Sequence, residues 1–213
     1  MTTTCSHSST DAPGLDEPVR TTPPGNAQPS GCSLGGSAQP SGSATPRRAA
    51  HSSIEEVLQR NAAFAATYKD TDAPRPPRMK LAVISCMDSR LDMYRILGVH
   101  EGDLHVIRNA GGVVTEDTIR SLVISQRIGG TREIMVIHNT ECGMLSFRDE
   151  ELKRQVAADV GREPTFAFHA FADLEQQVRQ DIAQIRNCQW LAYKDAVRGF
   201  IYDVRTGRLR EIR

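Results

Sequence analysis

Three short and almost wholly apolar runs constrain the fold of this chain more than any other feature. They are Leu81–Ile84, Leu104–Ile107 and Ile134–Ile137. Runs of this length that do not alternate with polar residues are typical of strands covered on both faces. Segments with helical spacing separate them, and strands that alternate with helices favour parallel pairing through right-handed crossovers. The sequence therefore predicts an α/β fold with a mainly parallel β-sheet flanked by helices.

Helical spacing and capping residues locate the other expected elements. The first helix follows Ser53, which with Glu56 has the form of a capping box, and it is expected to form an N-terminal helical arm. A hairpin is expected around Thr206-Gly207, between two apolar segments near the C-terminus. The predicted helices cover residues 54–68, 92–97, 115–128, 146–160 and 174–185.

The composition divides the chain into two parts. Residues 1–53 hold seven of the eleven prolines and six of the sixteen glycines, and they contain no Phe, Trp or Tyr. Such a segment cannot bury enough apolar surface to offset the entropy lost on ordering. We therefore predict a disordered low-complexity tail over 1–53 and a single folded domain over 54–213.

Charge and cysteine usage exclude several classes of function. The formal net charge is zero and the charges are interspersed, so no basic face for nucleic acid is expected. No apolar run is long enough to span a membrane. Five scattered cysteines do not suit a disulfide scaffold, which indicates a reduced, cytoplasmic protein.

Three possible metal ligands lie where predicted strands end. Cys86 follows the first run, His138 follows the third, and Cys142 comes four residues after His138. The carboxyl ends of parallel strands meet at one edge of a sheet, which is where such folds bind ligands. Two thiols and an imidazole suit zinc, and three protein ligands leave a fourth position open for water. The spacing of His138 and Cys142 alone is a weak signal for a zinc site, and the position of Cys86 at the end of another strand strengthens it.

Asp88 and Arg90 follow Cys86 and have two possible roles. A carboxylate near zinc can orient a bound water or can bind the metal itself. A guanidinium that grips the carboxylate through two hydrogen bonds would keep it off the metal. The alternative is an ordinary surface ion pair, worth less than about 1 kcal/mol.

The chain resembles the small, compact branch of the β-class carbonic anhydrases. The similarity rests on Cys86–Arg90, Arg108–Gly112 and His138–Gly143, in that order, and it extends over residues 54–213. It implies that Cys86, His138 and Cys142 bind Zn²⁺ and that Asp88 and Arg90 form a catalytic pair. It also implies reversible hydration of carbon dioxide to bicarbonate by zinc-bound hydroxide. The partner it implies is a second copy of the chain, in a homodimer or a higher oligomer with the N-terminal helix packed on that copy.

Other functions remain open at this point. Carbonyl sulfide and carbon disulfide hydrolases share the scaffold and the zinc site, so these motifs do not separate them from the anhydrases. A thiol phosphatase needs a longer loop than the three residues between Cys86 and Arg90. A non-catalytic zinc-stabilised module would have its fourth metal position permanently filled.

Overall fold

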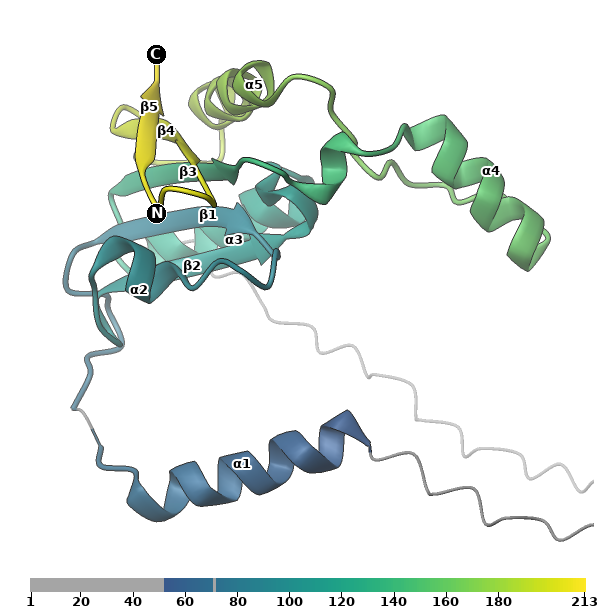
Figure 1. Cartoon of the computed structure of the whole chain (residues 1–213). Coiled ribbons are helices and arrows are strands. Elements are labelled where there is room, and N and C mark those ends of the chain that lie inside the picture. Colours follow the sequence, from purple (N-terminus) through teal and green to yellow (C-terminus); the bar gives the residue numbers. More distant parts are fainter. Residues whose placement is uncertain (1–51, 71) are drawn as a thin grey trace, which may run out of the picture. The chain divides into compact units, whose positions relative to one another are not determined.

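The computed structural model describes residues 52–70 and 72–213 (Figure 1). The chain divides into two compact units, 1–56 and 57–213, so nearly all of the first unit and of the predicted tail lies outside the described residues. The helices are α1 (Ser53–Thr67), α2 (Met93–Leu97), α3 (Glu116–Arg127), α4 (Asp149–Val160) and α5 (Leu174–Asn187). The strands are β1 (Leu81–Cys86), β2 (Leu104–Asn109), β3 (Glu133–Asn139), β4 (Val197–Tyr202) and β5 (Leu209–Ile212).

The strands form one mixed sheet in the order β2-β1-β3-β4-β5. β1 pairs in parallel with β2 and β3, and β3 pairs in parallel with β4. Only the hairpin partner β5 is antiparallel in the described sheet. The predicted α/β class and mainly parallel sheet are therefore confirmed.

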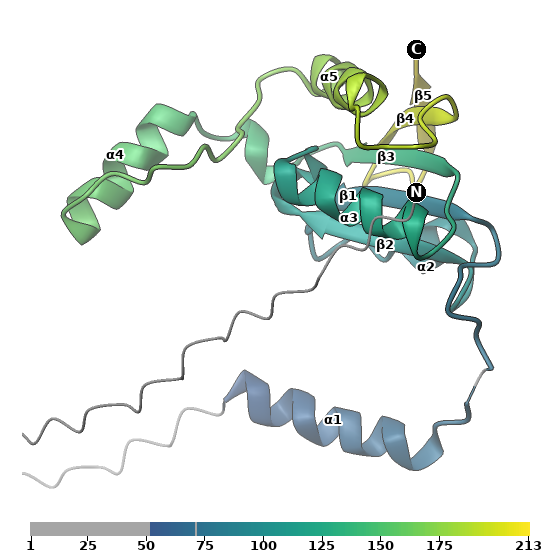
Figure 2. The ribbon, with the colours of Figure 1, turned by 180° about the vertical axis from the view of Figure 1, so that it is seen from behind.

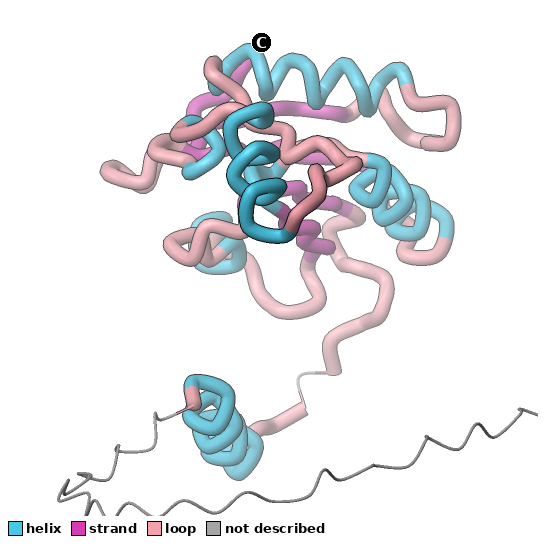
Figure 3. The backbone as a smooth tube through the Cα atoms, turned by 90° about the vertical axis from the view of Figure 1, so that its right-hand side faces the viewer, coloured by secondary structure: helices cyan, strands magenta, loops and turns pink. Residues whose placement is uncertain are grey.

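Helices cover both faces of this sheet. α3 lies behind the strands in Figure 1 and in front of them in Figure 2, where α2 falls on the far side. Figure 3 views the strands from the side, with helices to either side of them. Side chains alternate along β1, so Ala82 and Ile84 join one core with α3 and α5 while Val83 joins a second core with Met93 of α2.

Side chains cap the starts of three of the described helices, and Asp173 does so for α5. The Asp92 carboxylate accepts the Arg95 N–H at the start of α2, and Gly98 ends that helix in the left-handed conformation. Thr115 caps α3 in the same way. The helix predicted from residue 146 instead begins at Asp149, because Ser146 closes a preceding 3₁₀ turn, η2 (Gly143–Leu145), through its hydroxyl.

The helix α1 is described in full and buries none of its residues. Its apolar side chains are exposed, among them Ile54, Val57, Leu58 and Phe64. The predicted N-terminal helix is therefore present, with apolar side chains that the described residues leave exposed. Within the described ranges, each helix is too short or too polar to cross a lipid bilayer.

Candidate metal centre

The parallel register brings the predicted ligands to one rim of the sheet. Cys86 pairs with Asn109 at the end of β2, and the β1–β3 ladder pairs Ser85 with Ile137. One residue further, Cys86 and His138 therefore lie on neighbouring strands. Segments distant in sequence converge here because parallel strands share their carboxyl ends.

The two predicted sulfur ligands are in contact. Cys86 Sγ lies 3.8 Å from Cys142 Sγ, and both residues are buried. Two zinc–sulfur bonds of about 2.3 Å meeting at a tetrahedral angle of about 109° would separate their sulfurs by about 3.8 Å. The observed separation is the one that two cysteines sharing one tetrahedral ion require.

The thiols of Cys86 and Cys142 differ in pKa. A hydrogen bond from the Cys142 thiol lowers the pKa of Cys86 to about 6, and the backbone N–H groups of Asp88 and Gly111 act in the same direction against burial. The same contact and burial raise the pKa of Cys142. Cys142 is followed directly by the three-residue turn η2, so a helix dipole contributes little here.

His138 is held by a buried carboxylate that the sequence analysis did not identify. Its Nε2 lies 2.8 Å from Asp181 Oδ2, and both side chains are buried almost completely. Asp181 also accepts hydrogen bonds from Val114 N–H and from Gln177, which fix its orientation. A carboxylate that accepts from Nε2–H sets the tautomer of the ring and leaves the lone pair on Nδ1.

The two thiols fit zinc in type and spacing, but within the described residues no contact places the His138 ring beside them. His138 is hydrogen-bonded to Asp181 of α5, and Asn139 is the β3 side chain that reaches Asp88. Within residues 52–70 and 72–213, no three His, Cys, Asp or Glu side chains are gathered closely enough to form a complete metal cage. The sulfur pair is already at a zinc-compatible distance, and Nδ1 of His138 is one of four buried side-chain atoms in these ranges without a hydrogen-bond partner. An unpartnered buried nitrogen is costly unless a ligand completes it.

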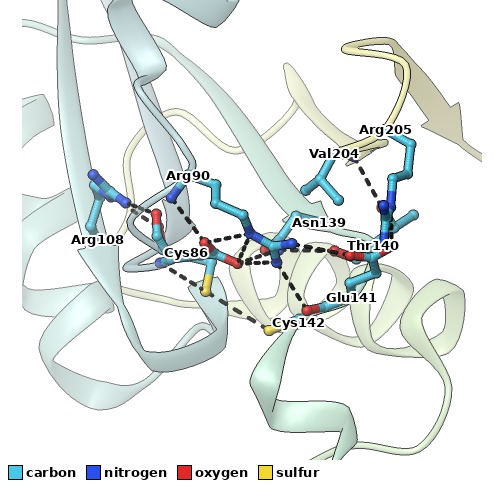
Figure 4. A network of polar contacts seen from close by, with 10 residues as sticks. Cys86, Arg90, Arg108, Asn139, Thr140, Glu141, Cys142, Val204 and Arg205 are labelled. Atoms are coloured by element: carbon cyan, nitrogen blue, oxygen red, sulfur yellow. Dashed lines mark hydrogen bonds and ion pairs between the residues drawn. The ribbon is translucent and has the colours of Figure 1, made fainter.

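Asp88 and Arg90 form the predicted pair beside the sulfurs (Figure 4). Arg90 Nη2 lies 2.6 Å from Asp88 Oδ2, while its Nε and its backbone N–H each donate to Oδ1 at 3.0 Å. Asn139 adds a fourth donor to Oδ2 at 3.1 Å. Arg90 is the main reason that the pKa of Asp88 falls to about 2, so the carboxylate is charged near neutral pH. Four contacts fill about the whole acceptor capacity of a carboxylate and hold it in one orientation.

The loop that carries Asp88 is fixed by its neighbours on β2. Arg108 donates from Nε to the Cys86 carbonyl at 2.9 Å and from Nη2 to the Asp88 carbonyl at 2.7 Å. Gly112 approaches so closely that a Cβ there would lie 2.8 Å from Cys86 N, and its φ of +72° also favours glycine. The Arg108–Gly112 segment therefore supports the end of β1.

Replacing Asp181 with Asn tests the role of this carboxylate. The amide can still accept from Val114 N–H, but its NH₂ group would donate to Nε2 and so place the ring proton on Nδ1. We expect affinity for zinc to fall by about 10- to 100-fold, as is typical for second-sphere partners of a ligating histidine. Competition with a chelator of known affinity measures the change.

Asp103→Asn is the control, because Asp103 accepts the His100 N–H and pairs with Arg78 at the start of β2, away from the rim. Unchanged zinc affinity in Asp181→Asn would contradict this role.

The chain is similar to known proteins over nearly all of its described part. The family model described as carbonic anhydrase matches residues 81–209. "Beta-carbonic anhydrase 1" of Mycobacterium tuberculosis is 45% identical over 158 residues, which span 74% of this chain and 96% of that protein. A "Carbon disulfide hydrolase" of Acidianus is 32% identical over 64% of this chain and 78% of its own length.

A solved structure supports the same relationship. The crystal structure of carbonic anhydrase from Streptococcus mutans matches with a TM-score of 0.73 and 39% identity, covering 77% of this chain and 99% of that one. The fold, the order of the three motifs and these similarities agree with one another. The chain therefore belongs to the β-carbonic anhydrase family.

Proposed function

We propose that this chain is a zinc-dependent carbonic anhydrase that interconverts carbon dioxide and bicarbonate. Cys86, His138 and Cys142 would hold the metal. The single observation that carries the proposal is the 3.8 Å sulfur pair at the rim of the sheet, next to the ordered Asp88–Arg90 pair. Membership of the family and the 45% identity to the mycobacterial enzyme support the choice of reaction.

The proposed mechanism assigns separate roles to the metal and to Asp88. Zinc held at this site would lower the pKa of a coordinated water to about 7, which would make hydroxide available near neutrality. Asp88 supplies a fixed negative charge and a hydrogen-bond acceptor beside the sulfurs. Its side chain is 14% exposed, so solvent reaches it. Arg90 keeps the carboxylate turned away from the metal ligands.

Carbon disulfide hydrolysis is the second candidate, favoured by the similarity to the Acidianus hydrolase. The residues of the rim do not distinguish carbon dioxide from its sulfur analogues. Assays of the purified chain with carbon dioxide, carbonyl sulfide and carbon disulfide decide between them, and we expect the highest kcat/KM with carbon dioxide. A non-catalytic zinc module would be inactive with all three substrates throughout about pH 7 to 9, where zinc-bound water ionises.

We also propose that the chain forms a homodimer in the cytoplasm. The apolar side chains of α1 are exposed, and packing against a second copy of the chain would bury them. A reducing compartment would keep the thiols of Cys86 and Cys142 available for metal.

Leu58→Arg tests the dimer. Leu58 is 62% exposed, so its replacement costs the isolated domain little, but a charge on the apolar side of α1 should disfavour association. We expect sedimentation velocity to show a monomer for Leu58→Arg and a dimer for the unmodified chain. The same dimer in both would contradict the assigned surface.

Cys142→Ser should lose zinc and hydration activity together, because a hydroxyl is a poor ligand where a soft thiolate is required. Metal analysis and stopped-flow hydration of the same preparation measure both quantities. Cys188→Ser is the control, since Cys188 is a free cysteine only half buried at the end of α5. Full activity in Cys142→Ser would refute the proposed ligand set.

Asp88→Ala should keep zinc but reduce kcat/KM by about 100-fold or more, because it removes a positioned acceptor and charge and no metal ligand. Asp117→Ala provides a matched control, as it breaks another Asp–Arg pair, with a 2.6 Å contact to Arg120, on the exposed side of α3. A metal-free Asp88→Ala protein would instead show that Asp88 supports the zinc site.

A further inference from the structure

Glu141 has an unusual backbone conformation immediately before Cys142. Its φ is +55°, which places it among four non-glycine residues with positive φ in the described ranges. Side chains other than glycine, asparagine and aspartate rarely adopt this conformation, because Cβ crowds the backbone. Surrounding contacts must therefore hold the residue in place.

Those contacts connect Glu141 to the catalytic pair on one side. Arg90 Nη2 donates to the Glu141 carbonyl at 3.1 Å, and Arg90 Nη1 donates to Oε2 at 3.1 Å. Together with the bonds to Asp88, four of the five N–H groups of the Arg90 guanidinium are engaged. Because Asp88 accepts from Nε and Nη2 while Glu141 accepts from Nη1 and Nη2, the rigid guanidinium cannot rotate without breaking bonds to both.

On its other side, Glu141 is bound to the turn between β4 and β5. Arg205 Nε donates to Oε1 at 2.6 Å. The turn is itself ordered, since the Asp203 carboxylate accepts the N–H groups of Arg205 and Thr206. The neighbouring Thr140 ties the turn to β3, with its N–H donating to Tyr202 O and its hydroxyl accepting from Val204 N–H. Figure 4 shows this series of contacts from Arg205 through Glu141 to Arg90.

We infer that Glu141 is a positioning residue: with Arg205 it fixes the Arg90 guanidinium, and thereby keeps Asp88 turned away from the metal ligands. The inference rests on the proposed function and adds the β4–β5 turn to the parts of the chain that control the site. The carboxylate of Glu141 contacts Arg90 and Arg205, so it acts on the site through Arg90.

Stability is a poor measure of this role. The side chains of Glu141, Arg90 and Arg205 are 42%, 47% and 78% exposed, and ion pairs at such positions contribute little to folding. The effect of Glu141 should instead appear in the mobility of the Arg90 guanidinium and in kcat. The chain offers a matched control in Glu175, which also bridges two arginines, Arg179 at 3.0 Å and Arg210 at 2.9 Å, and is 40% exposed.

The first test uses the full chain without metal. Nitrogen-15 NMR measures exchange of the Arg90 side-chain N–H protons with water in the unmodified chain, in Glu141→Gln and in Glu175→Gln. We expect exchange at Arg90 to become at least about tenfold faster in Glu141→Gln, because an NH₂ group, which cannot accept, replaces one of the two oxygens that now accept separately from Arg90 and Arg205. We expect Glu175→Gln to leave Arg90 unchanged. Equal exchange in all three proteins would overturn the inference, whatever the outcome for the proposed function.

The second test uses the zinc-loaded chain and stopped-flow hydration. Glu141→Gln should retain zinc and lower kcat by about tenfold, while Glu175→Gln stays within twofold of the unmodified chain. Arg205→Gln should lower kcat less, and adding it to Glu141→Gln should change nothing further, as expected of residues that act in series. Loss of zinc in Glu141→Gln, or a kcat equal to that of Glu175→Gln, would overturn the inference. An inactive unmodified chain would instead count against the proposed function, and the NMR result alone would then decide the role of Glu141.

Discussion

The contact between Cys86 and Cys142 is the constraint on which the rest of the site depends. It exists because β1 and β3 pair in parallel, so that chain segments separated by more than fifty residues end at the same rim. Two buried thiols stay 3.8 Å apart only if the end of β1 and the loop after β3 are held in fixed positions. The close approach of Gly112 and the two hydrogen bonds from Arg108 show how the neighbouring strand maintains that geometry.

Two polar networks at the carboxyl end of the sheet differ in their physical settings. The His138–Asp181 pair is buried, where removing one partner leaves the other without compensation and is costly. The Arg90–Glu141–Arg205 series is largely exposed, where water competes with each bond. The buried pair therefore fixes the orientation of the His138 ring.

Much of the fold was predictable because apolar runs and capping residues are local signals. Leu81–Ile84 and Ile134–Ile137 identified two strands, but the strands continue to Cys86 and Asn139 because backbone pairing does not stop where apolar residues do. The strand ends also indicated Cys86, His138 and Cys142, and the Asp88–Arg90 contact was foreseen from their spacing. The roles assigned to these five residues remain predictions.

Other features of the site depend on contacts between distant segments and could not be predicted in this way. Asp181 lies 43 residues from His138, and its one signal was an aspartate on the face of α5 that also carries Val178 and Ile185. Glu141 and Arg205 are exposed charges 64 residues apart, and no local pattern distinguishes them from other surface charges. The start of α4 was misplaced because a short hydroxyl closes a 3₁₀ turn as readily as it caps a helix.

X-ray absorption at the zinc edge of the metal-loaded chain tests the central claim most directly. The account predicts one zinc per chain with two sulfur ligands at about 2.3 Å, one imidazole nitrogen at about 2.0–2.1 Å and one further light-atom ligand. A shell made only of nitrogen and oxygen, a shell of four sulfurs, or a chain that takes up no zinc would contradict it.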